Sequence, residues 1–578
     1  MNRKGVFYGS FTILGIIMVI ICVALQISIN VPLFHKEKIQ FSDHYGNKVS
    51  CSYFSSTSIS HNDKGIMLFH GFAEDQHSMN SYIDSFLQLG FQIFTIDFTG
   101  HGLSSGYFTL QEQVDNVTAN EVLLAKEQFK KISNLTDNQI YMIGHSLGGR
   151  AILRAATLDP NICAGLVLIG SPVNLDGGYM INSVWLEELS PLNPKTNISI
   201  ITGTLDDVLS STDAIQIFEK LSGAKFNESG SSILTSQNNI IELNIINCLL
   251  HTYEVISPKS IVTAILSIYH FSQEIFPKEL PQQIQNHQLY RLSTWLLIPI
   301  GLFYFVVFGI YFLDQTKLGF NEEITKNNDD DKIENSETIN SSSIKLVNTK
   351  RYFSYKPLIL LSSFLFGGLY AIIFFVLPFG LPTFTLIYAC PIAGYGTIML
   401  ILFATGKVPG IEGKWQPNTI ELKEFLDWKK PIIALLIGSV ITVVFALVIN
   451  FSWNNVLTPT VKIYWLVILT LVTSLGFYVK RKESELIREV HPGRYNYIFY
   501  NNLLYLSPFI LVAFILLFMG ISFLFIDAFH GFAIFTLVVF SGGLIHRFCK
   551  NTYFTALLQS IMLIFLVLPR SPLMSFFY

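Results

Sequence analysis

A serine, an aspartate and a histidine occur in this order along the chain, each shortly after an apolar segment. Ser146 lies in the stretch GHSLGG, Asp206 in GTLDDV and His251 in HTYE. A serine hydroxyl becomes a strong nucleophile when a histidine takes its proton and an acid orients that histidine. The residue types and their order therefore predict nucleophilic catalysis by Ser146, with His251 as the base and Asp206 as the acid.

The residues around Ser146 match the G-x-S-x-G pattern of a nucleophile elbow. In this motif the serine sits on a strained turn between a strand and a helix, which exposes its hydroxyl. Gly144 and Gly148 are expected there because a Cβ at either position would collide with the neighbouring strand or helix. The apolar run before the motif and the helix-like stretch after it supply this context, which favours a nucleophile over a turn serine.

The acid has one rival in the sequence. Asp207 follows Asp206 directly, and either carboxylate could face the histidine. Asp206 is preferred because it lies three residues after Gly203 and leaves the predicted strand first.

No group of His, Cys, Asp and Glu residues has the spacing of a metal site, so we predict no metal and no cofactor.

The elements that must position these residues alternate between strands and helices. Apolar runs of strand length are followed by amphipathic stretches, which predicts a mostly parallel sheet with helices on both faces. Ligands bind at the carboxyl ends of the strands in such sheets, so the polar residues that follow the runs should meet at one edge. The predicted strands are 65–69, 91–98, 139–144, 164–170, 198–203 and 240–246, and the predicted helices are 77–89, 113–131, 147–158, 212–222 and 258–275.

Five motifs in this region resemble the α/β-hydrolase family, and within it the monoacylglycerol lipase-like and serine aminopeptidase-like hydrolases. The resemblance covers about residues 36–280 and implies a catalytic triad of Ser146, Asp206 and His251. It also implies an oxyanion hole formed by the backbone N–H groups of Phe72 and Leu147, each typically contributing about 3 kcal/mol to transition-state stabilisation. The motifs are HGFAED (70–75), DFTGHGLSSG (97–106), GHSLGG (144–149), GTLDDV (203–208) and HTYE (251–254).

One departure from the family concerns the cap. The related hydrolases carry a lid between the sixth strand and the acid-bearing strand, whereas only residues 171–197 fill this gap here. We therefore expect a minimal cap and an open site edged by Met180, Trp185 and Leu186. Family membership by itself does not determine the substrate, so lipid specificity does not follow from the resemblance.

The composition indicates a membrane protein. Of the 578 residues, 51% are hydrophobic and only 14% are charged, which exceeds the apolar share of a typical soluble domain. A net charge of −3 without a basic stripe makes nucleic acid an unexpected partner, and the six scattered cysteines do not suggest a disulfide framework. We predict a transmembrane signal anchor at 1–31, an α/β-hydrolase catalytic domain at 32–285 and a polytopic all-α membrane domain of about eight helices at 286–578.

Nine apolar runs are near the roughly 20 residues that cross a bilayer. A cleaved signal peptide is the alternative for the first run, which is longer than a typical signal core and lacks a clean cleavage site. If Arg3 and Lys4 are cytoplasmic, the loops predicted to be cytoplasmic are rich in lysine and arginine. The loops and the tail predicted to lie on the other side hold only Lys462 and Arg570. This distribution predicts that the catalytic domain lies on the extracytoplasmic or lumenal face. The polar segment 318–350 is predicted to be a disordered loop. The predicted spans are 5–30, 292–313, 357–378, 383–404, 431–451, 463–479, 502–526, 529–546 and 553–569.

The sequence favours a membrane-bound serine hydrolase that cleaves an ester, thioester or amide through an acyl-enzyme on Ser146, with esterase activity preferred over peptidase activity. Lipid-like acyl esters are favoured substrates, and membrane lipids favoured partners, because the site is tethered to a bilayer. Two alternatives stay open: a transporter or receptor in which the hydrolase-like domain is a binding or regulatory module, and acyl transfer to a second substrate. The predicted spans carry no carboxylate or lysine near the middle, which argues against a coupled transporter. The oligomeric state is not predicted, nor is the use of the four N-x-S/T sequons in the predicted catalytic domain.

Overall fold

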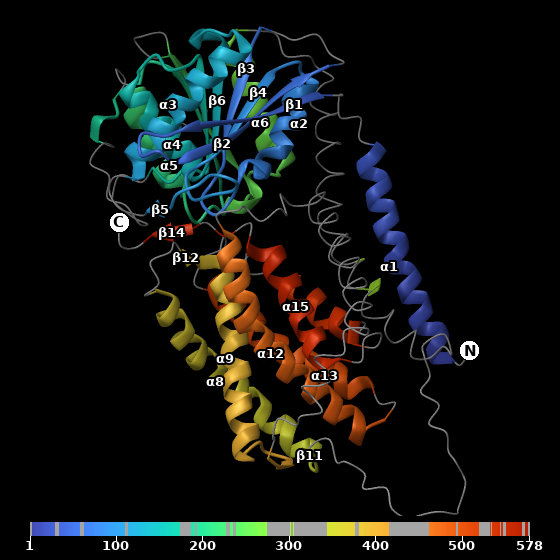
Figure 1. Cartoon of the computed structure of the whole chain (residues 1–578). Helices are drawn as coiled ribbons and strands as arrows, with labels where there is room; N and C mark the ends of the chain where they lie inside the picture. The colour runs from blue at the N-terminus through green and yellow to red at the C-terminus, as the bar shows by residue number, and fades with distance from the viewer. Residues whose placement is uncertain are drawn as a thin grey trace, which may run out of the picture.

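The computed structural model consists of a strand-rich part and a bundle of long helices, shown in Figure 1 with the strand-rich part above. The structure describes residues 3–28, 34–57, 63–109, 114–173, 187–190, 194–226, 232–234, 239–273, 344–375, 381–414, 462–492, 495–518, 534–543, 551–568 and 573–575, and the single positions 301, 304, 305, 532, 545, 546 and 571.

A nine-stranded sheet forms the centre of the strand-rich part, in the order β1-β2-β4-β3-β6-β7-β8-β10-β9. The neighbours from β4 through to β10 pair in parallel, whereas β1 with β2, β2 with β4 and β9 with β10 are antiparallel pairs. The parallel strands therefore direct their carboxyl ends to one edge. The strands are β1 (Phe34–Ser42), β2 (Lys48–Ser56), β3 (Gly65–Phe69), β4 (Gln92–Asp97), β6 (Ile140–His145), β7 (Gly165–Ile169), β8 (Asn197–Gly203), β9 (Ser232–Leu234) and β10 (Ile240–Ile246).

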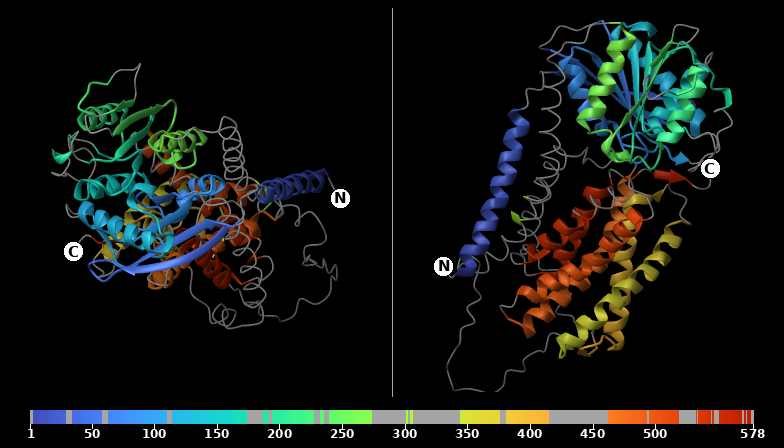
Figure 2. Two further views of the ribbon diagram at one scale, coloured as in Figure 1. Left: turned by 90° about the horizontal axis from the view of Figure 1, so that it is seen from above. Right: turned by 180° about the vertical axis from the view of Figure 1, so that it is seen from behind.

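Helices cover both faces of the sheet, as Figures 1 and 2 show. Successive side chains of a strand point to opposite faces, and in β3 Ile66 and Leu68 pack in one apolar cluster while Met67 and Phe69 pack in the other. The first cluster includes α2 (Asn80–Gln88) and α6 (Pro258–Phe271). The second includes α3 (Val114–Ser133), α4 (Leu147–Leu158) and α5 (Ser211–Ser222).

This architecture confirms the fold predicted for the strand-rich part. Every predicted strand and helix is present, and the ends differ from the prediction by a few residues. The helix predicted at 77–89 begins as the 3-10 helix η1 (Gln76–Met79), which leads directly into α2. The sheet is mostly parallel with helices on both faces, as expected. The domain boundaries at 32 and 285 stay predictions.

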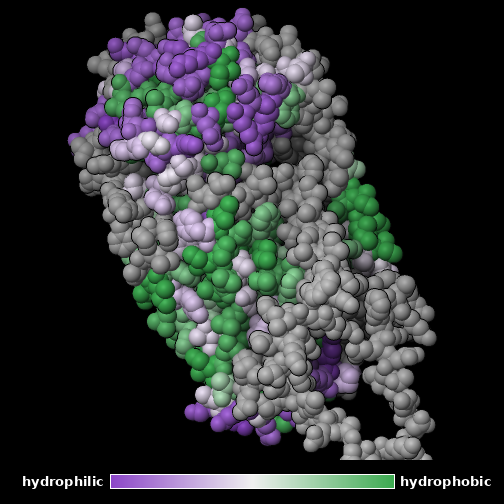
Figure 3. Space-filling model, in the orientation of Figure 1, coloured by the Kyte–Doolittle hydropathy of each residue, from purple (hydrophilic) through white to green (hydrophobic). Residues whose placement is uncertain are grey.

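Long apolar helices make up the second part of the molecule. Among the described residues, three helices are long and apolar enough to cross a membrane: α8 (Thr349–Phe375), Thr385–Thr405 within α9 (Thr383–Thr405), and α12 (Ile463–Val490). Figure 3 shows hydrophobic side chains across the visible face of the bundle and mostly hydrophilic ones over the strand-rich part. The other described helices here are α1 (Arg3–Ser28), α13 (Tyr495–Phe518) and α15 (Thr552–Val567).

Most of the nine predicted spans coincide with these helices. The first overlaps α1, and the runs at 357–378, 383–404 and 463–479 overlap α8, α9 and α12. Shorter apolar helices at Ile534–Gly543 and Thr552–Val567 overlap the last two predicted spans. The predicted span 431–451 and nearly all of 292–313 lie outside the described residues. The count of nine spans and their orientation therefore stay predictions.

The helix α12 is longer than the sequence indicates. The predicted span 463–479 stops before Lys480, where a basic loop is expected, but the helix continues to Val490. Glu483 of α12 lies 2.6 Å from the ammonium of Lys356 of α8, and both side chains are fully buried. Because this acid neutralises a lysine of the neighbouring helix, the charged segment packs inside the bundle and stays helical.

The predicted disordered loop at 318–350 is also wrong at its carboxyl end. Ile344–Leu346 forms strand β11, which pairs antiparallel with β13 (Ile411–Gly413), and α8 begins at Thr349. Ile344 and Leu346 are buried in the apolar cluster of the bundle, and this burial accounts for the ordered strand. Residues 318–343 lie outside the described residues.

A three-stranded sheet, which we call the junction, connects the two parts of the molecule. Its order is β12 (Leu381–Pro382), β14 (Leu573–Ser575) and β5 (Phe108–Thr109). β5 belongs to the strand-rich part and follows the carboxyl end of β4, whereas β12 and β14 lie beside the bundle (Figure 1). Because the parallel strands end at a common edge, this edge of the large sheet faces the bundle.

Candidate active site

Ser146 occupies a strained turn between β6 and α4. Its backbone φ is 49°, in the left-handed region that residues with a Cβ rarely adopt. A Cβ on Gly144 would lie 2.3 Å from the backbone nitrogen of Gly149, and a Cβ on Gly148 would lie 2.3 Å from the carbonyl oxygen of Phe69 in β3. The two glycines thus let the helix approach the strands closely, as predicted for a nucleophile elbow.

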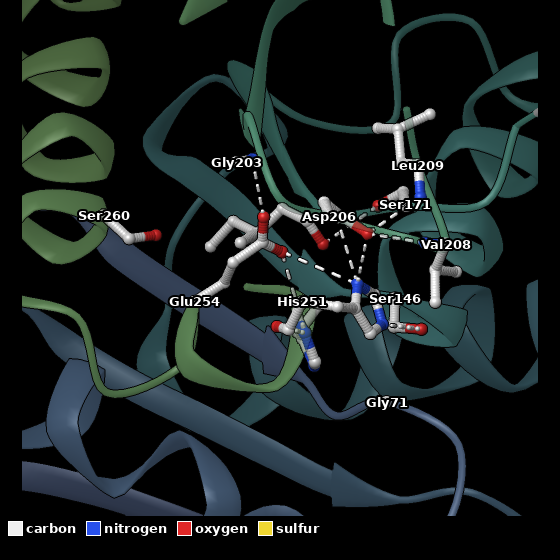
Figure 4. A network of polar contacts seen from close by, with 12 residues as sticks. Gly71, Ser146, Ser171, Gly203, Asp206, Val208, Leu209, His251, Glu254 and Ser260 are labelled. Atoms are coloured by element: carbon white, nitrogen blue, oxygen red, sulfur yellow. Dashed lines mark hydrogen bonds and ion pairs between the residues drawn. The ribbon is translucent and has the colours of Figure 1, made fainter. Parts of the chain in front are cut away.

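The structure brings Ser146, His251 and Asp206 together (Figure 4). Nε2 of His251 lies 3.1 Å from the hydroxyl oxygen of Ser146. Nδ1 of the same ring lies 3.2 Å from both carboxylate oxygens of Asp206. All three residues are buried, with 4 to 8% of their surface exposed. A single ring therefore connects the hydroxyl to the acid, although the three residues come from three separate loops.

The loop after β8 fixes the carboxylate of Asp206. Its Oδ1 accepts hydrogen bonds from the backbone N–H groups of Val208 (2.7 Å) and Leu209 (2.9 Å). Burial favours a raised pKa for Asp206, but His251 and these two N–H groups outweigh burial and keep the pKa below its usual value. The acid is therefore ionised at neutral pH and accepts a hydrogen bond from Nδ1.

The predicted oxyanion donors flank the serine. Leu147 is the first residue of α4 and follows Ser146 directly. Gly71 lies so close to the serine that a Cβ on it would be 3.2 Å from the Cβ of Ser146, and Phe72 follows Gly71. Figure 4 places Gly71 near Ser146. Leu147 and Phe72 thus directly follow Ser146 and Gly71, and their role as oxyanion donors stays a prediction.

An ion pair connects the loop at Gly71 to His251, and sequence reasoning did not assign this pair a role. Glu74 accepts a hydrogen bond from the N–H of Gly71 (2.8 Å) and lies 3.3 Å from Nδ1 of His145. The other ring nitrogen of His145 lies 3.2 Å from the carbonyl oxygen of His251. Burial opposes both charges, yet mutual attraction raises the pKa of His145 and lowers that of Glu74 to about 2. A charged His145 can therefore donate to both acceptors.

Glu254 is a second acid at the triad. Its side chain is fully buried, with one oxygen accepting from the N–H of Gly203 (3.0 Å) and the other 3.8 Å from Nδ1 of His251. Burial and the adjacent charge of Asp206 raise the pKa of Glu254 well above its usual value, so Glu254 resists ionisation beside an ionised Asp206. A Cβ on Gly170 (φ 52°) would lie 2.0 Å from Glu254, so only glycine leaves room for the second acid.

Both missed acids lie inside motifs that are recognisable in the sequence. Glu254 lies three residues after His251 in the HTYE motif, and Glu74 lies in HGFAED. Neither motif reveals the partner, because the contacts to Gly203 and His145 join segments that are distant along the chain.

His145, His251 and Glu254 also offer ligand atoms within 4.8 Å of one another, a spacing that could hold a metal ion. All four ring nitrogens in this group already have partners, which are Glu74, the carbonyl oxygen of His251, Asp206 and Ser146. Hydrogen bonding therefore accounts for the cluster, and we assign it no metal. The residues expected to edge the site, Met180, Trp185 and Leu186, lie outside the described residues.

Comparison with known proteins relates the strand-rich part to known hydrolases. Residues 60–225 match the family described as Serine aminopeptidase, S33. The chain is 21% identical over 136 residues to the monoglyceride lipase homolog of Monkeypox virus, which covers 23% of this chain and 47% of the viral protein. It is 28% identical over 112 residues to epoxide hydrolase B of Mycobacterium tuberculosis, which covers 18% of this chain and 28% of the relative.

The match thus spans about half the length of the first curated relative and less of the second. Among solved structures, an esterase of Pyrococcus furiosus aligns with 41% of this chain and 91% of its own length, at 15% identity and a TM-score of 0.31. The family match lies inside the strand-rich part and includes the elbow and Asp206. Residues 60–225 are therefore similar to the S33 hydrolases, and the strand-rich part has the α/β-hydrolase fold.

Proposed function

We propose that the chain is a membrane-bound serine hydrolase that cleaves an ester through an acyl-enzyme on Ser146. The observation that carries this proposal is the line of contacts from the hydroxyl of Ser146 through His251 to Asp206, with distances of 3.1 and 3.2 Å. These are hydrogen-bond distances, and the order hydroxyl, imidazole, carboxylate is the one that nucleophilic catalysis needs. Thioesters and amides are the other acyl compounds that the same chemistry can cleave.

The proposed reaction has two halves. The oxygen of Ser146 attacks the acyl carbon while Nε2 of His251 takes the hydroxyl proton, and the resulting oxyanion accepts hydrogen bonds from the N–H groups of Leu147 and Phe72. The histidine then gives its proton to the leaving group, which departs as an alcohol and leaves the acyl-enzyme. A water molecule, deprotonated by His251, attacks the acyl carbon next and releases the acid. Asp206 stays ionised and stabilises the imidazolium in both halves.

A lipid-like acyl ester is the favoured substrate class. The edge of the sheet that carries Ser146 faces the bundle at the junction, and three helices of the bundle are long and apolar enough to cross a membrane. A substrate held at the membrane surface would then reach the serine without leaving the surface completely. The similarity to a monoglyceride lipase homolog is consistent with this class, whereas the match to the serine aminopeptidase family S33 also permits amides.

The proposed topology has nine spans, with the N-terminus in the cytoplasm and the catalytic domain on the extracytoplasmic or lumenal face. The distribution of lysine and arginine among the loops supports it. Asn134 offers a test, because it begins an N-x-T sequon, is exposed and follows the end of α3. When the chain is translated into microsomes, Asn134 should be glycosylated, and Asn134→Gln should abolish that glycan. Absence of a glycan at Asn134 would argue for the opposite orientation.

Hydrolysis by the full chain in lipid nanodiscs tests the activity. p-Nitrophenyl butyrate, a monoacylglycerol and a peptide anilide should be compared with wild type and Ser146→Ala. We expect hydrolysis of both esters at a rate well above that of the anilide, and loss of all hydrolysis in Ser146→Ala. Equal rates in the two proteins would overturn the proposal and favour a binding or regulatory module. Faster consumption of the ester when an alcohol is added would favour acyl transfer.

A further inference from the structure

The bundle contacts the catalytic domain directly beside the oxyanion loop. β14 pairs in parallel with β5, with Met574 opposite Phe108 and Ser575 opposite Thr109. The N–H of Leu573 also donates a hydrogen bond to the carbonyl of Gly100 (2.9 Å), in the loop between β4 and β5. These backbone bonds join residues that are more than 450 positions apart in the sequence, so they require the two parts to be correctly docked.

The bundle holds β14 firmly on its other side. The side chain of Leu573 is buried in an apolar cluster with Trp465 of α12 and Leu381 of β12. β12 pairs antiparallel with β14, and the N–H of Thr385 donates to the hydroxyl of Ser571 (3.1 Å). β14 is thus anchored by bundle side chains while its backbone binds the catalytic domain.

Aromatic contacts continue from β5 to the oxyanion loop. The ring of Phe108 lies 5.5 Å from that of Phe72 and 4.9 Å from that of His101. The ring of His101 lies 5.2 Å from that of His70, whose Nε2 accepts from the N–H of Phe98 (3.0 Å). Phe72 is the residue whose N–H is the proposed oxyanion donor. A shift of β5 would therefore displace the rings against which this residue packs.

A buried lysine adds a charged contact at the same place. Lys462, directly before α12, donates to the carbonyl oxygen of Ser571 (2.7 Å) and is 1% exposed. Burial lowers the pKa of Lys462 to about 8, while the charges of Asp75 and Asp97 in the catalytic domain oppose that shift. Asp75 caps η1, just after the oxyanion loop, and Asp97 accepts from the N–H of Leu103 (2.9 Å). The lysine thus holds the backbone of Ser571, two residues before β14, and the charges of the two acids act on it from the catalytic domain.

We propose that the junction strand β14 and Lys462 of the bundle position the oxyanion loop, residues 71–74, for catalysis. The bundle then acts as a required part of the hydrolytic site and does more than anchor it in the membrane. This inference rests on the proposed hydrolase function for its kinetic test, although the loop structure can be measured without activity.

The test compares Leu573→Pro and Lys462→Met in the full chain. Leu573→Pro removes the N–H that binds Gly100, and Lys462→Met keeps the length of the side chain while removing its charge. Lys345→Pro, in β11 at the far end of the bundle (Figure 1), is the matched control for a proline in a short strand. Lys462→Arg should restore most of what Lys462→Met loses. Each protein is assayed with p-nitrophenyl butyrate and by hydrogen–deuterium exchange of peptides covering 70–79 and 98–109.

Loss of one oxyanion donor lowers kcat about 10²–10³-fold, which sets the upper limit for an indirect effect. We expect kcat to fall about 10- to 100-fold in both test variants while KM changes less than about threefold, since the loop acts on the transition state. Exchange in the two peptides should accelerate, and the control should resemble wild type. Unchanged kcat and exchange in Lys462→Met and Leu573→Pro would overturn the inference. If Leu573→Pro does not fold, Lys462→Met and its arginine rescue decide the outcome. An inactive wild type would refute the proposed function, and exchange alone would then decide the role of the junction.

Discussion

Replacement of Asp206 by asparagine tests the acid of the triad with little change in shape. Oδ1 of Asp206 accepts two backbone N–H groups, from Val208 at 2.7 Å and Leu209 at 2.9 Å. An asparagine keeps its oxygen on these donors, because an amide NH₂ group cannot accept them. Its nitrogen then takes the place of Oδ2, so an N–H group replaces one of the two oxygens that lie 3.2 Å from Nδ1 of His251.

The amide introduced by Asp206→Asn changes the tautomer of His251. An N–H group that faces Nδ1 of His251 requires that nitrogen to be an acceptor, so the ring proton moves to Nε2. Nε2 lies 3.1 Å from the hydroxyl of Ser146 and can no longer take its proton. We therefore expect kcat of Asp206→Asn to fall about 10³–10⁴-fold. KM should change little, because Asp206 contacts the histidine and is not a proposed substrate contact.

Asp207→Asn is the matched control, since it makes the same chemical change one residue later. Its kcat should stay within about threefold of wild type, as for a substitution away from the reacting groups. Both variants are measured as the full chain with p-nitrophenyl butyrate, and their thermal unfolding is compared to exclude a folding defect. A loss of less than tenfold in Asp206→Asn, or an equal loss in Asp207→Asn, would refute this assignment of the acid.

Three further outcomes follow from buried charges in the catalytic domain. Adding Glu254→Gln to Asp206→Asn should lower kcat about tenfold more, because the second acid, 3.8 Å from the histidine, can no longer ionise in place of the first; identical rates for the single and double variants would contradict this. Arg150→Met should destabilise the fold by about 3–5 kcal/mol, because Arg150 binds Asp115 of α3 through two buried hydrogen bonds (2.7 and 2.9 Å). Denaturant unfolding measures this loss of stability. A loss below about 1 kcal/mol would contradict the structural role of this ion pair. Burial raises the pKa of Glu121 from 4.5 to about 8, so the folded state binds more protons than the unfolded state between these values. The free energy of unfolding should therefore fall as pH rises from 4.5 to 8, by up to about 1.4 kcal/mol per pH unit. Glu121→Gln should flatten this pH profile in thermal unfolding. A wild-type stability that does not fall over this pH range would contradict the raised pKa of Glu121.

The sequence predicted those features that depend on local pattern. The elbow could be located because close packing within a few residues requires its glycines, and because a short apolar strand precedes it and a helix follows it. The mostly parallel sheet and the place of Ser146 at its carboxyl edge then follow from the alternation of strands and helices. Asp206 and His251 were identified from their positions after strands, and the structure places both at the serine.

Features made by contacts between distant segments were not predicted. Glu254 and His145 sit inside recognised motifs, but their partners come from other loops, so their roles were not visible. The Lys356–Glu483 pair was missed for the same reason, since each residue alone resembles a charge at the end of a span. The junction is the clearest case, because nothing near Leu573 in the sequence indicates a strand that binds Gly100.

The most direct test of the central claim is to label the full chain with a fluorophosphonate probe and to identify the modified residue by mass spectrometry. Such probes react with serines that a neighbouring histidine has activated. The account predicts one labelled site, Ser146, and no labelling of Ser146→Ala under the same conditions. A folded wild-type protein that does not react, or a label that persists in Ser146→Ala, would contradict the claim that Ser146, His251 and Asp206 form a working catalytic triad.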